Sequence, residues 1–365
     1  MQYALTRKLA DAMKIKPPSE HEVRDPLYCW TVNWAKVWSN SRTGDMLVLV
    51  NHATSFTVAI YEIKRKDLRN VAEMMRAAIS NTLLSLGLNP DIVAEYMRQA
   101  GESEFVLNHS RQTAAWVTRA GNDCAFHIAR EYDGIDKVFN DTVGALINHH
   151  LVSCPGNSRE MCYPRDEMFN ALARLTDRQL YRYRALELLV TLDLEVYRAA
   201  RRLIVPADMR LSRLHRLLQS VFGWKNCHLH DFVIHDRDGR RIVRLVPYGD
   251  DLEYDRDAVL VGRHTLSEVF PKYRNMLYTY DMGDDWVHVI QLVRVIEDYD
   301  KESPYLLEAS GQTPPEDVGG VGGFLSFRRI MLDPKHPDHA EMRAWAGYWT
   351  VDLSEFMRTP RVIHA

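Results

Sequence analysis

The chain has 365 residues, of which 46% are hydrophobic and 26% charged, and its formal net charge is −3. This composition excludes a disordered, collagen-like or coiled-coil chain, and the length predicts two domains with separate cores. The longest apolar runs, such as residues 46–50, are far shorter than the roughly 20 residues that a membrane-spanning helix needs.

Five cysteines are spread along the chain, and no two of them have CxxC spacing. An odd number without metal-ligand spacing predicts reduced thiols rather than a disulfide framework or a zinc ribbon. The N-terminal segment MQYALTRKLADAM carries no long apolar stretch and no cleavage signal. We therefore expect a cytoplasmic protein with no membrane partner.

The first regular elements are expected between residues 44 and 100. Residues 44–63 contain two β-branched apolar runs around a polar turn, which predicts a hairpin. A helix should follow, with Asp67 as its N-cap and Gly87 as its end. Asn89 and Pro90 form a cap and a first helical position, so they predict the start of the next helix.

Aromatic spacing predicts helices elsewhere in this half. Trp30, Trp34 and Trp38 recur at every fourth position, which favours a packed helix face over base stacking, the alternative for exposed tryptophans. Residues 116–128 predict a further helix that is interrupted near Gly121.

Residues 153–167 concentrate turn formers without periodicity, which predicts either the end of the first domain or a loop packed against it. We place the boundary near residue 175. An N-terminal domain then covers residues 1–175 and a C-terminal domain covers residues 176–365.

The second domain begins with two expected strands, residues 185–194 and 201–206. Leucines then recur at helical spacing over residues 211–222, with Asp208 or Ser212 near the start and Gly223 as the end.

Strands are expected next over residues 228–236, 241–247 and 276–296, followed by a Gly/Pro loop over residues 314–323 and C-terminal helices. This order predicts an α+β fold, with a mixed or antiparallel sheet packed against helices in each domain.

Charge is distributed unevenly along the chain. Residues 1–173 carry a net charge of −1, residues 174–249 carry +7 and residues 250–365 carry −9. The two opposite blocks either pair within the domain or leave a basic face for a nucleic acid. The candidate nucleic-acid-binding residues are the arginines of the basic block: Arg201, Arg202, Arg210, Arg213 and Arg216.

Metal-ligating residue types gather in three segments of the second domain. His228 and His230 are two apart on an expected strand, so both should point to one face. Asp281 and His288 flank the sequence MGDDWV and complete the candidate metal ligands.

The candidate catalytic carboxylates are Asp284, Asp285, Glu316 and Asp317. If the three segments converge on a divalent metal, metal-assisted hydrolysis becomes possible, with a carboxylate taking a proton from bound water. The alternative is structural: the aspartates cap turns, the histidines bond buried backbone, and Glu316 and Asp317 rigidify their loop. No HExxH, GxxxxGK[ST] or GxSxG motif is present.

The second domain resembles the plasmid pRiA4b ORF-3-like family, also described as an insertion-element passenger protein of TnpR type. The resemblance rests on three blocks, in order, over residues 180–358: LIVPADMRLSRLHRLLQSVFGWKNCHLHDF, YTYDMGDDWVHVIQL and PPEDVGGVGGF. Met282 and Thr313 depart from the family, which more often has Phe and Cys there.

The first domain resembles a bacterial family of unknown function, through LTRKLADAMKIKP, LVLVNHATSFTVAIY and VTRAGND. Arg119 and Gly121 depart from that family's pattern of small residues.

The resemblance implies a compact α+β bacterial protein found on plasmids and mobile elements. We therefore expect a binding or regulatory module whose partner is a protein or a nucleic acid. The alternative is a metal-dependent hydrolase centred on His228, His230, Asp284 and His288.

Overall fold

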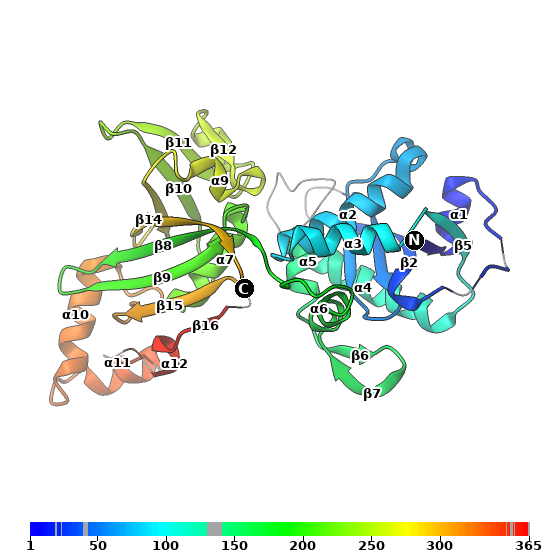
Figure 1. Cartoon of the computed structure of the whole chain (residues 1–365). Helices are drawn as coiled ribbons and strands as arrows, with labels where there is room; N and C mark the ends of the chain where they lie inside the picture. The colour runs from blue at the N-terminus through cyan, green and yellow to red at the C-terminus, as the bar shows by residue number, and fades with distance from the viewer. Residues whose placement is uncertain are drawn as a thin grey trace. The chain divides into compact units, whose positions relative to one another are not determined.

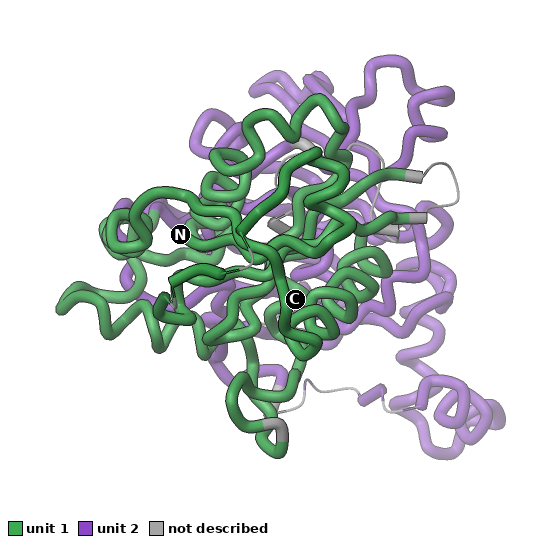
Figure 2. Tube along the Cα trace, turned by 90° about the vertical axis from the view of Figure 1, so that its right-hand side faces the viewer, with its two compact units in different colours: residues 1–131, 135–183 green, residues 132–134, 184–365 purple. Residues whose placement is uncertain are grey.

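The computed structural model describes residues 1–18, 20–22, 24–38, 43–129, 141–347, 349–350, 353 and 355–363. These residues form two compact units, one within residues 1–183 and the other within residues 184–363 (Figure 2). In the described part of the chain, no helix is both long and apolar enough to cross a membrane. Both units combine sheets with helices, so the fold is α+β, as expected.

The first unit is built on a five-stranded sheet of order β4-β3-β2-β1-β5 (Figure 1). Strand β1 pairs in parallel with β2 and β5, whereas β2, β3 and β4 pair antiparallel. The strands are β1 (Gln2–Leu5), β2 (Cys29–Trp38), β3 (Thr43–Asn51), β4 (Thr57–Tyr61) and β5 (Glu104–Leu107).

Helices cover both faces of this sheet, because alternate residues of its strands are apolar on opposite sides. Leu47 and Leu49 lie in one core with α2 and α3, whereas Met46 and Val48 lie in a second core with α4 and α5. The helices are α1 (Arg7–Met13), α2 (Val71–Ser85), α3 (Pro90–Gln99), α4 (Arg111–Ala129), α5 (Asp141–Ile147) and α6 (Pro164–Ala173), with short 3-10 turns at Pro26–Tyr28 and Arg65–Asn70.

The structure confirms the hairpin of β3 and β4 and the cap at Asn89, whose side chain accepts a hydrogen bond from the Asp91 amide. The helix expected from Asp67 begins instead at Val71, since Asp67 lies in a 3-10 turn that precedes it. The capping residues thus predicted the presence of this helix correctly, but not the residue at which it begins.

Three expectations for this unit were wrong. Strand β2 contains Trp30, Trp34 and Trp38. The helix prediction failed because a spacing of four residues keeps positions on one face of a strand as well as of a helix. Helix α4 runs through Gly121, where an added methyl would lie 3.5 Å from Cβ of Ala35, an ordinary contact. Residues 153–167 include the small hairpin β6 (Val152–Cys154) and β7 (Asn157–Cys162) and the start of α6.

The second unit contains a nine-stranded sheet of order β12-β11-β10-β13-β14-β8-β9-β15-β16. Its neighbours pair antiparallel along β10, β11, β13 and β14, and also along β8, β9, β15 and β16. The strands are β8 (Tyr183–Asp193), β9 (Arg198–Pro206), β10 (His230–His235), β11 (Arg241–Val246), β12 (Ala258–Leu260), β13 (Asn275–Tyr280), β14 (Trp286–Tyr299), β15 (Tyr305–Ser310) and β16 (Arg361–Val362).

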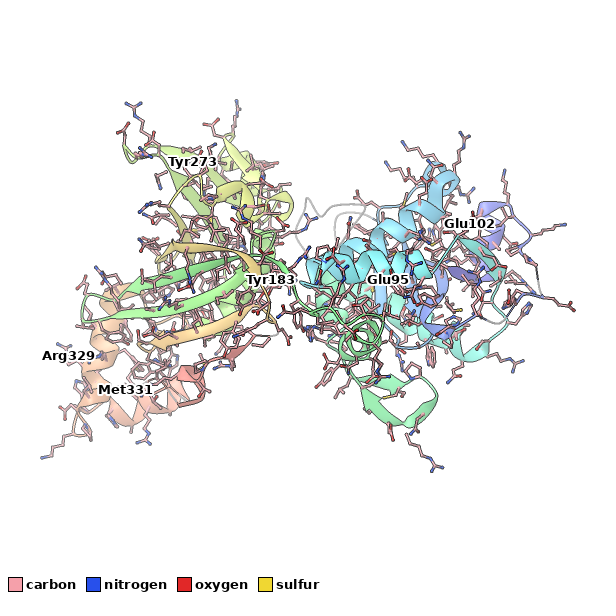
Figure 3. All side chains as sticks on the ribbon, viewed as in Figure 1. Glu95, Glu102, Tyr183, Tyr273, Arg329 and Met331 are labelled. Carbon is pink, nitrogen blue, oxygen red and sulfur yellow. The ribbon has the colours of Figure 1, made fainter. Side chains whose placement is uncertain are left out.

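Helix α7 (Leu211–Phe222) packs on this sheet and forms its core, as its leucine spacing predicts. It ends at Gly223, which adopts the left-handed conformation with φ of 79°. The other helices are α8 (Asp251–Tyr254), α9 (Leu266–Val269), α10 (Gly320–Leu332), α11 (His339–Ala346) and α12 (Glu355–Arg358), with a 3-10 turn at Val261–Arg263. The side chains that fill both units are drawn in Figure 3.

The opposite charge blocks of the second unit pair partly with each other. Arg184 lies 3.3 Å from Glu297, and Arg241 lies 2.7 Å from Asp255. The buried Glu187 carboxylate accepts hydrogen bonds from Arg202 and from Arg294, each at 2.6 Å. The basic and acidic blocks therefore neutralise each other, in part, through ion pairs within the unit.

Candidate metal centre

The three segments picked out by their histidines and carboxylates converge on His228. Its Nε2 atom lies 3.0 Å from Oδ1 of Asp317, 3.5 Å from Oδ2 of Asp281 and 3.7 Å from Oε2 of Glu316. His228 precedes β10 and Asp281 follows β13. Glu316 and Asp317 belong to the PPED loop, residues 314–317, which precedes α10. Two strand ends and one helix entry thus bring together residues that are up to 89 positions apart in the chain.

Asp281 serves the β13–β14 turn and the cluster with different oxygens. Its Oδ1 accepts hydrogen bonds from the amides of Gly283, at 2.9 Å, and Asp284, at 3.3 Å. Its Oδ2 faces His228. The turn-capping and ligand interpretations of this residue are therefore compatible, because one carboxylate has enough acceptor sites for both.

Glu316 is held by two donors from other segments. Its Oε1 accepts hydrogen bonds from the Lys225 amide at 2.5 Å and from the Tyr280 hydroxyl at 3.2 Å. Burial, the first cause, raises the pKa of Tyr280, so this hydroxyl stays a donor near neutral pH. Glu316 therefore has a defined position even though it lies in a loop.

The Nε2 atom of His228 is the distinctive feature of the cluster. It is buried yet forms no hydrogen bond with any residue that the structure describes, although three carboxylates surround it. Buried polar atoms usually have a hydrogen-bond partner, so an exception calls for an explanation, such as a bound ion or water. The ligand atoms form two overlapping groups that share His228, one with Asp281 and Asp317 and the other with Glu316 and Cys227, and within each group all the ligand atoms lie within 4.8 Å of one another.

Two residues that the sequence interpretation missed complete the surroundings. Cys227 supplies a thiol whose Sγ lies within 4.8 Å of the ligand atoms of His228 and Glu316. Tyr280 accepts a hydrogen bond from the Cys227 amide at 3.1 Å and donates to Glu316. Their direct adjacency to His228 and Asp281 in the chain was the available signal.

The other two candidate histidines lie away from this cluster. Strand β10 begins at His230, so His228 lies before the strand and the expectation that both share one strand face was wrong. The ring of His230 stacks on that of His215. His288 is fully buried and faces the carbonyls of Trp286 and Tyr278 through Nδ1. Both rings lie in the core, and the contacts of His288 with buried backbone carbonyls are those that the structural alternative proposed.

The remaining candidate aspartates shape the turn. Oδ2 of Asp284 accepts a hydrogen bond from the Gly319 amide at 3.1 Å, which ties the β13–β14 turn to the PPED loop. Asp285 has a φ of 55°, a left-handed conformation that aspartate tolerates better than most residues. Neither residue belongs to the ligand groups around His228. Both shape the backbone of the β13–β14 turn.

The candidate arginines do not form an exposed basic face. Arg201 is fully buried and donates hydrogen bonds to the carbonyls of Val221, Ala200, Ser310 and Gly311. Burial lowers its pKa to about 10.

The other four arginines are also partly used inside the unit. Arg213 is buried, Arg202 pairs with Glu187, and Arg210 donates to the Gly262 carbonyl. Arg216 is half-buried on α7, a helix that lies almost wholly in the core. The interpretation of these residues as a phosphate-binding surface therefore fails for Arg201 and Arg213, because buried guanidinium groups cannot reach a nucleic acid.

Each half of the chain matches the model of a different protein family. Residues 184–358 match the family model of the plasmid pRiA4b ORF-3-like protein. A protein of Sinorhizobium fredii (strain NBRC 101917 / NGR234), described as "Uncharacterized protein y4hQ", is 38% identical over 161 residues, which are 43% of this chain and 78% of that protein. The chain belongs to the plasmid pRiA4b ORF-3-like family.

In this chain, the PPED loop and the YDMGDDW turn, both inside the matched residues 184–358, carry the carboxylates that lie near His228. Residues 2–167 match the model of DUF6933, a domain of unknown function. A crystal structure of a protein of unknown function, MM3350 from Methanosarcina mazei Go1, is 24% identical and covers 47% of this chain and 95% of its own, with a TM-score of 0.43.

Proposed function

We propose that the pRiA4b ORF-3-like unit binds a divalent metal ion through His228, Asp281, Glu316 and Asp317. The observation that carries the proposal is the buried Nε2 atom of His228, which forms no hydrogen bond within the described part of the chain and has oxygens of three carboxylates at 3.0–3.7 Å. Metal–ligand bonds are about 2 Å long, so ligand atoms a few ångströms apart can share one ion.

The donor set favours manganese or zinc among the divalent ions. One imidazole with two or three carboxylates is harder than the thiolate-rich set of a structural zinc site and softer than an all-oxygen magnesium site. Asp317 is the most exposed member, with 68% of its side chain accessible. The ion would therefore keep an open position toward solvent, which is typical of catalytic rather than structural sites.

A metal-assisted hydrolysis is the reaction that this arrangement supports best. A bound divalent ion lowers the pKa of a coordinated water, and a neighbouring carboxylate can take its proton. The exposed Asp317 is the candidate base through the carboxylate oxygen that does not face His228, whereas the Tyr280 hydroxyl donates its single hydrogen to Glu316 and fixes that carboxylate.

Elemental analysis of the purified chain and calorimetric titration with Mn²⁺ and Zn²⁺ test the proposal. We expect one bound ion per chain and a loss of at least tenfold in affinity for His228→Gln and Glu316→Gln. His264→Gln is the matched control, because His264 also pairs with a carboxylate, Glu268 at 2.6 Å, outside the cluster. Absence of binding, or equal losses in all three variants, would contradict the proposal.

A binding or regulatory role is the second candidate, and it rests on the family's plasmid context and on the absence of a known catalytic motif from the sequence. Such a role needs a macromolecular partner, either a protein or a nucleic acid. Gel-shift and pull-down assays at low salt, with and without Mn²⁺, test it. Binding to no DNA, RNA or cellular protein in either condition would contradict it.

A further inference from the structure

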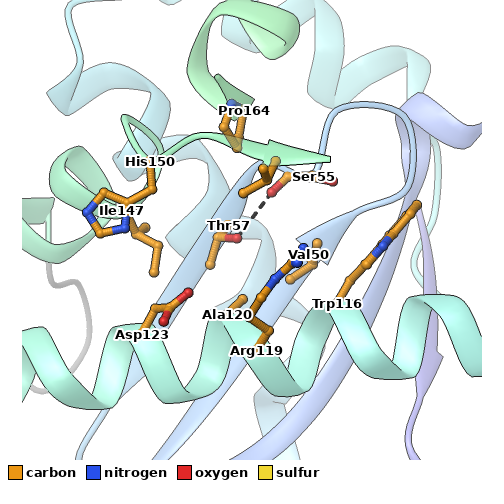
Figure 4. Close-up of a pocket in the computed structure, with 11 residues that line it drawn as sticks. Val50, Ser55, Thr57, Trp116, Arg119, Ala120, Asp123, Ile147, His150 and Pro164 are labelled. Carbon is orange, nitrogen blue, oxygen red and sulfur yellow. Dashed lines mark hydrogen bonds between the residues drawn. The ribbon is translucent and has the colours of Figure 1, made fainter. Parts of the chain in front are cut away.

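The pocket between α4 and the β3–β4 hairpin of the first unit is small (Figure 4). Its cavity volume is about 30 Å³, whereas small-molecule sites hold roughly 300–1,000 Å³. It has room for about one water molecule, which would give a partner to the buried Ser55 hydroxyl. A ligand site is better supported beside His228 in the second unit, where ligand-type side chains from three segments meet.

The thiol of Cys227 belongs to the same cluster as His228. Its Sγ atom, a ring nitrogen of His228 and a carboxylate oxygen of Glu316 all lie within 4.8 Å of one another. Zinc forms bonds of about 2.3 Å to sulfur and about 2.0–2.2 Å to nitrogen and oxygen, so two of its ligand atoms are at most about 4.5 Å apart. Small side-chain movements therefore suffice for these three atoms to share one ion.

The loop that carries Cys227 is tied to the rest of the cluster through its backbone. The Lys225 amide donates a hydrogen bond to Oε1 of Glu316 at 2.5 Å, and the Cys227 amide donates one to the Tyr280 hydroxyl at 3.1 Å. The Tyr280 hydroxyl in turn donates to Glu316 at 3.2 Å. The thiol and the carboxylate are thus held by the same donors, which fixes the position of one relative to the other.

The carboxylates of the cluster carry more negative charge than the described side chains around them neutralise. His228 is the basic side chain within 4.0 Å of Asp281, Glu316 and Asp317, and no lysine or arginine of the described residues lies that close to them. The side chains of Asp281 and Glu316 are only 10% and 7% exposed. Carboxylates that are buried together repel one another and lose hydration, so this arrangement favours a bound cation.

A thiolate selects among the cations that this cluster could hold. Zinc accepts sulfur, nitrogen and oxygen ligands, whereas manganese and magnesium favour carboxylate, carbonyl and water oxygens. We infer that Cys227 is a ligand of the metal site and increases its preference for Zn²⁺ over Mn²⁺, an inference that rests on the metal site proposed above. As the sulfur–zinc bond forms, the thiol loses its proton, which passes to solvent because Cys227 is exposed.

The test is calorimetric titration of the full chain and of Cys227→Ser with Zn²⁺ and with Mn²⁺. Zinc binds most sites more tightly than manganese, so the informative quantity is the preference that is lost with the thiol. We expect Zn²⁺ affinity to fall at least tenfold and Mn²⁺ affinity to change less than twofold. Cys154→Ser is the matched control, because Cys154 is a half-buried cysteine of the first unit, and it should leave both affinities unchanged.

Two further readouts report on the sulfur itself. The Co²⁺-loaded chain should show a thiolate-to-metal charge-transfer band in the near ultraviolet that Cys227→Ser lacks. Iodoacetamide should alkylate Cys227 readily in the metal-free chain, since the other four cysteines are buried or half-buried. Saturating Zn²⁺ should slow this alkylation at least tenfold and Mn²⁺ much less, as peptide mass spectrometry would measure.

The outcomes separate this inference from the metal site on which it rests. Zinc binding with equal affinity in Cys227→Ser, or without protection of Cys227 from alkylation, would overturn the inference and leave the site of His228 and the carboxylates standing. Absence of binding by either ion would overturn both. Circular dichroism of each variant verifies that it is folded.

Discussion

The imidazole ring of His215 lies flat on that of His230, with ring centroids 3.5 Å apart and ring planes 5° apart. His215 also contacts the Tyr278 hydroxyl at 2.8 Å and Oδ1 of Asn226 at 2.7 Å. Because Asn226 is two residues before His228, this buried stack connects α7 to the segment that carries the central residue of the candidate metal site. The protonation state of His215 and His230 should therefore affect the position of His228 as well as the packing of the core.

Stability should fall as the pH drops from about 6.5 to 4. Burial lowers the pKa of His215 and of His288 to about 4 and lowers that of His230 further, whereas the unfolded histidines titrate near 6.5. The unfolded chain then binds more protons than the folded chain in this window, so acid favours unfolding. At about 1.4 kcal/mol per pKa unit, His215 alone accounts for roughly 3 kcal/mol.

Urea unfolding at pH 7 and pH 5 measures this effect, and His215→Gln should reduce the pH dependence. The control variant His264→Gln, at a histidine outside the buried stack, should leave the pH dependence of stability unchanged. An unfolding free energy that is constant over this pH range would contradict the prediction.

Two substitutions at Asp281 should separate its turn role from its ligand role. Asp281→Asn keeps an acceptor for the amides of Gly283 and Asp284 but removes the charge, so stability should change by less than about 1 kcal/mol while Mn²⁺ affinity falls. Asp281→Ala removes both and should cost about 1–2 kcal/mol more. Denaturant unfolding and calorimetry on the same samples verify the difference, and equal stability of the two variants would contradict it.

Arg201→Met should be strongly destabilising. It leaves several buried carbonyls without donors, including those of Val221 and Ser310, and each unsatisfied group costs about 1–3 kcal/mol. We therefore expect a loss of at least about 3 kcal/mol by urea unfolding. Arg198→Met is the control on the same strand, because its pair with Asp193 is exposed to solvent and contributes little to stability. Similar losses in both variants would show that burial of Arg201 is not the cause.

Gly323→Ala should disturb the PPED loop. An added Cβ would lie 1.9 Å from the Val318 carbonyl oxygen, so the backbone that carries Glu316 and Asp317 must move. Overpacking of this kind costs about 1–3 kcal/mol, and Mn²⁺ affinity should fall with it. Gly322→Ala meets no atom within 4 Å and should stabilise α10 by up to about 1 kcal/mol. Thermal unfolding and metal titration of the pair decide the matter.

Apolar patterns were a good guide to the type of element. The leucines of α7 recur at helical spacing, and β3 is a continuous apolar run because both of its faces are buried, so both elements were recognised. The pattern misled at Trp30 and Trp34, where a spacing of four residues fits both periods, and only pairing with β3 selects the strand. Glycine likewise suggested a break at Gly121 that packing against β2 overrides.

The sequence by itself determined the two α+β units, most of their helices and strands, and the three segments that hold His228, Asp281 and Glu316. Only the tertiary structure decided which side chains meet. It buried His230 and His288 in the core, placed Arg201 among backbone carbonyls, and added Tyr280 to the cluster. The physical reason is that local propensity acts over a few residues, whereas a site depends on strand register and loop entry between segments far apart in the chain.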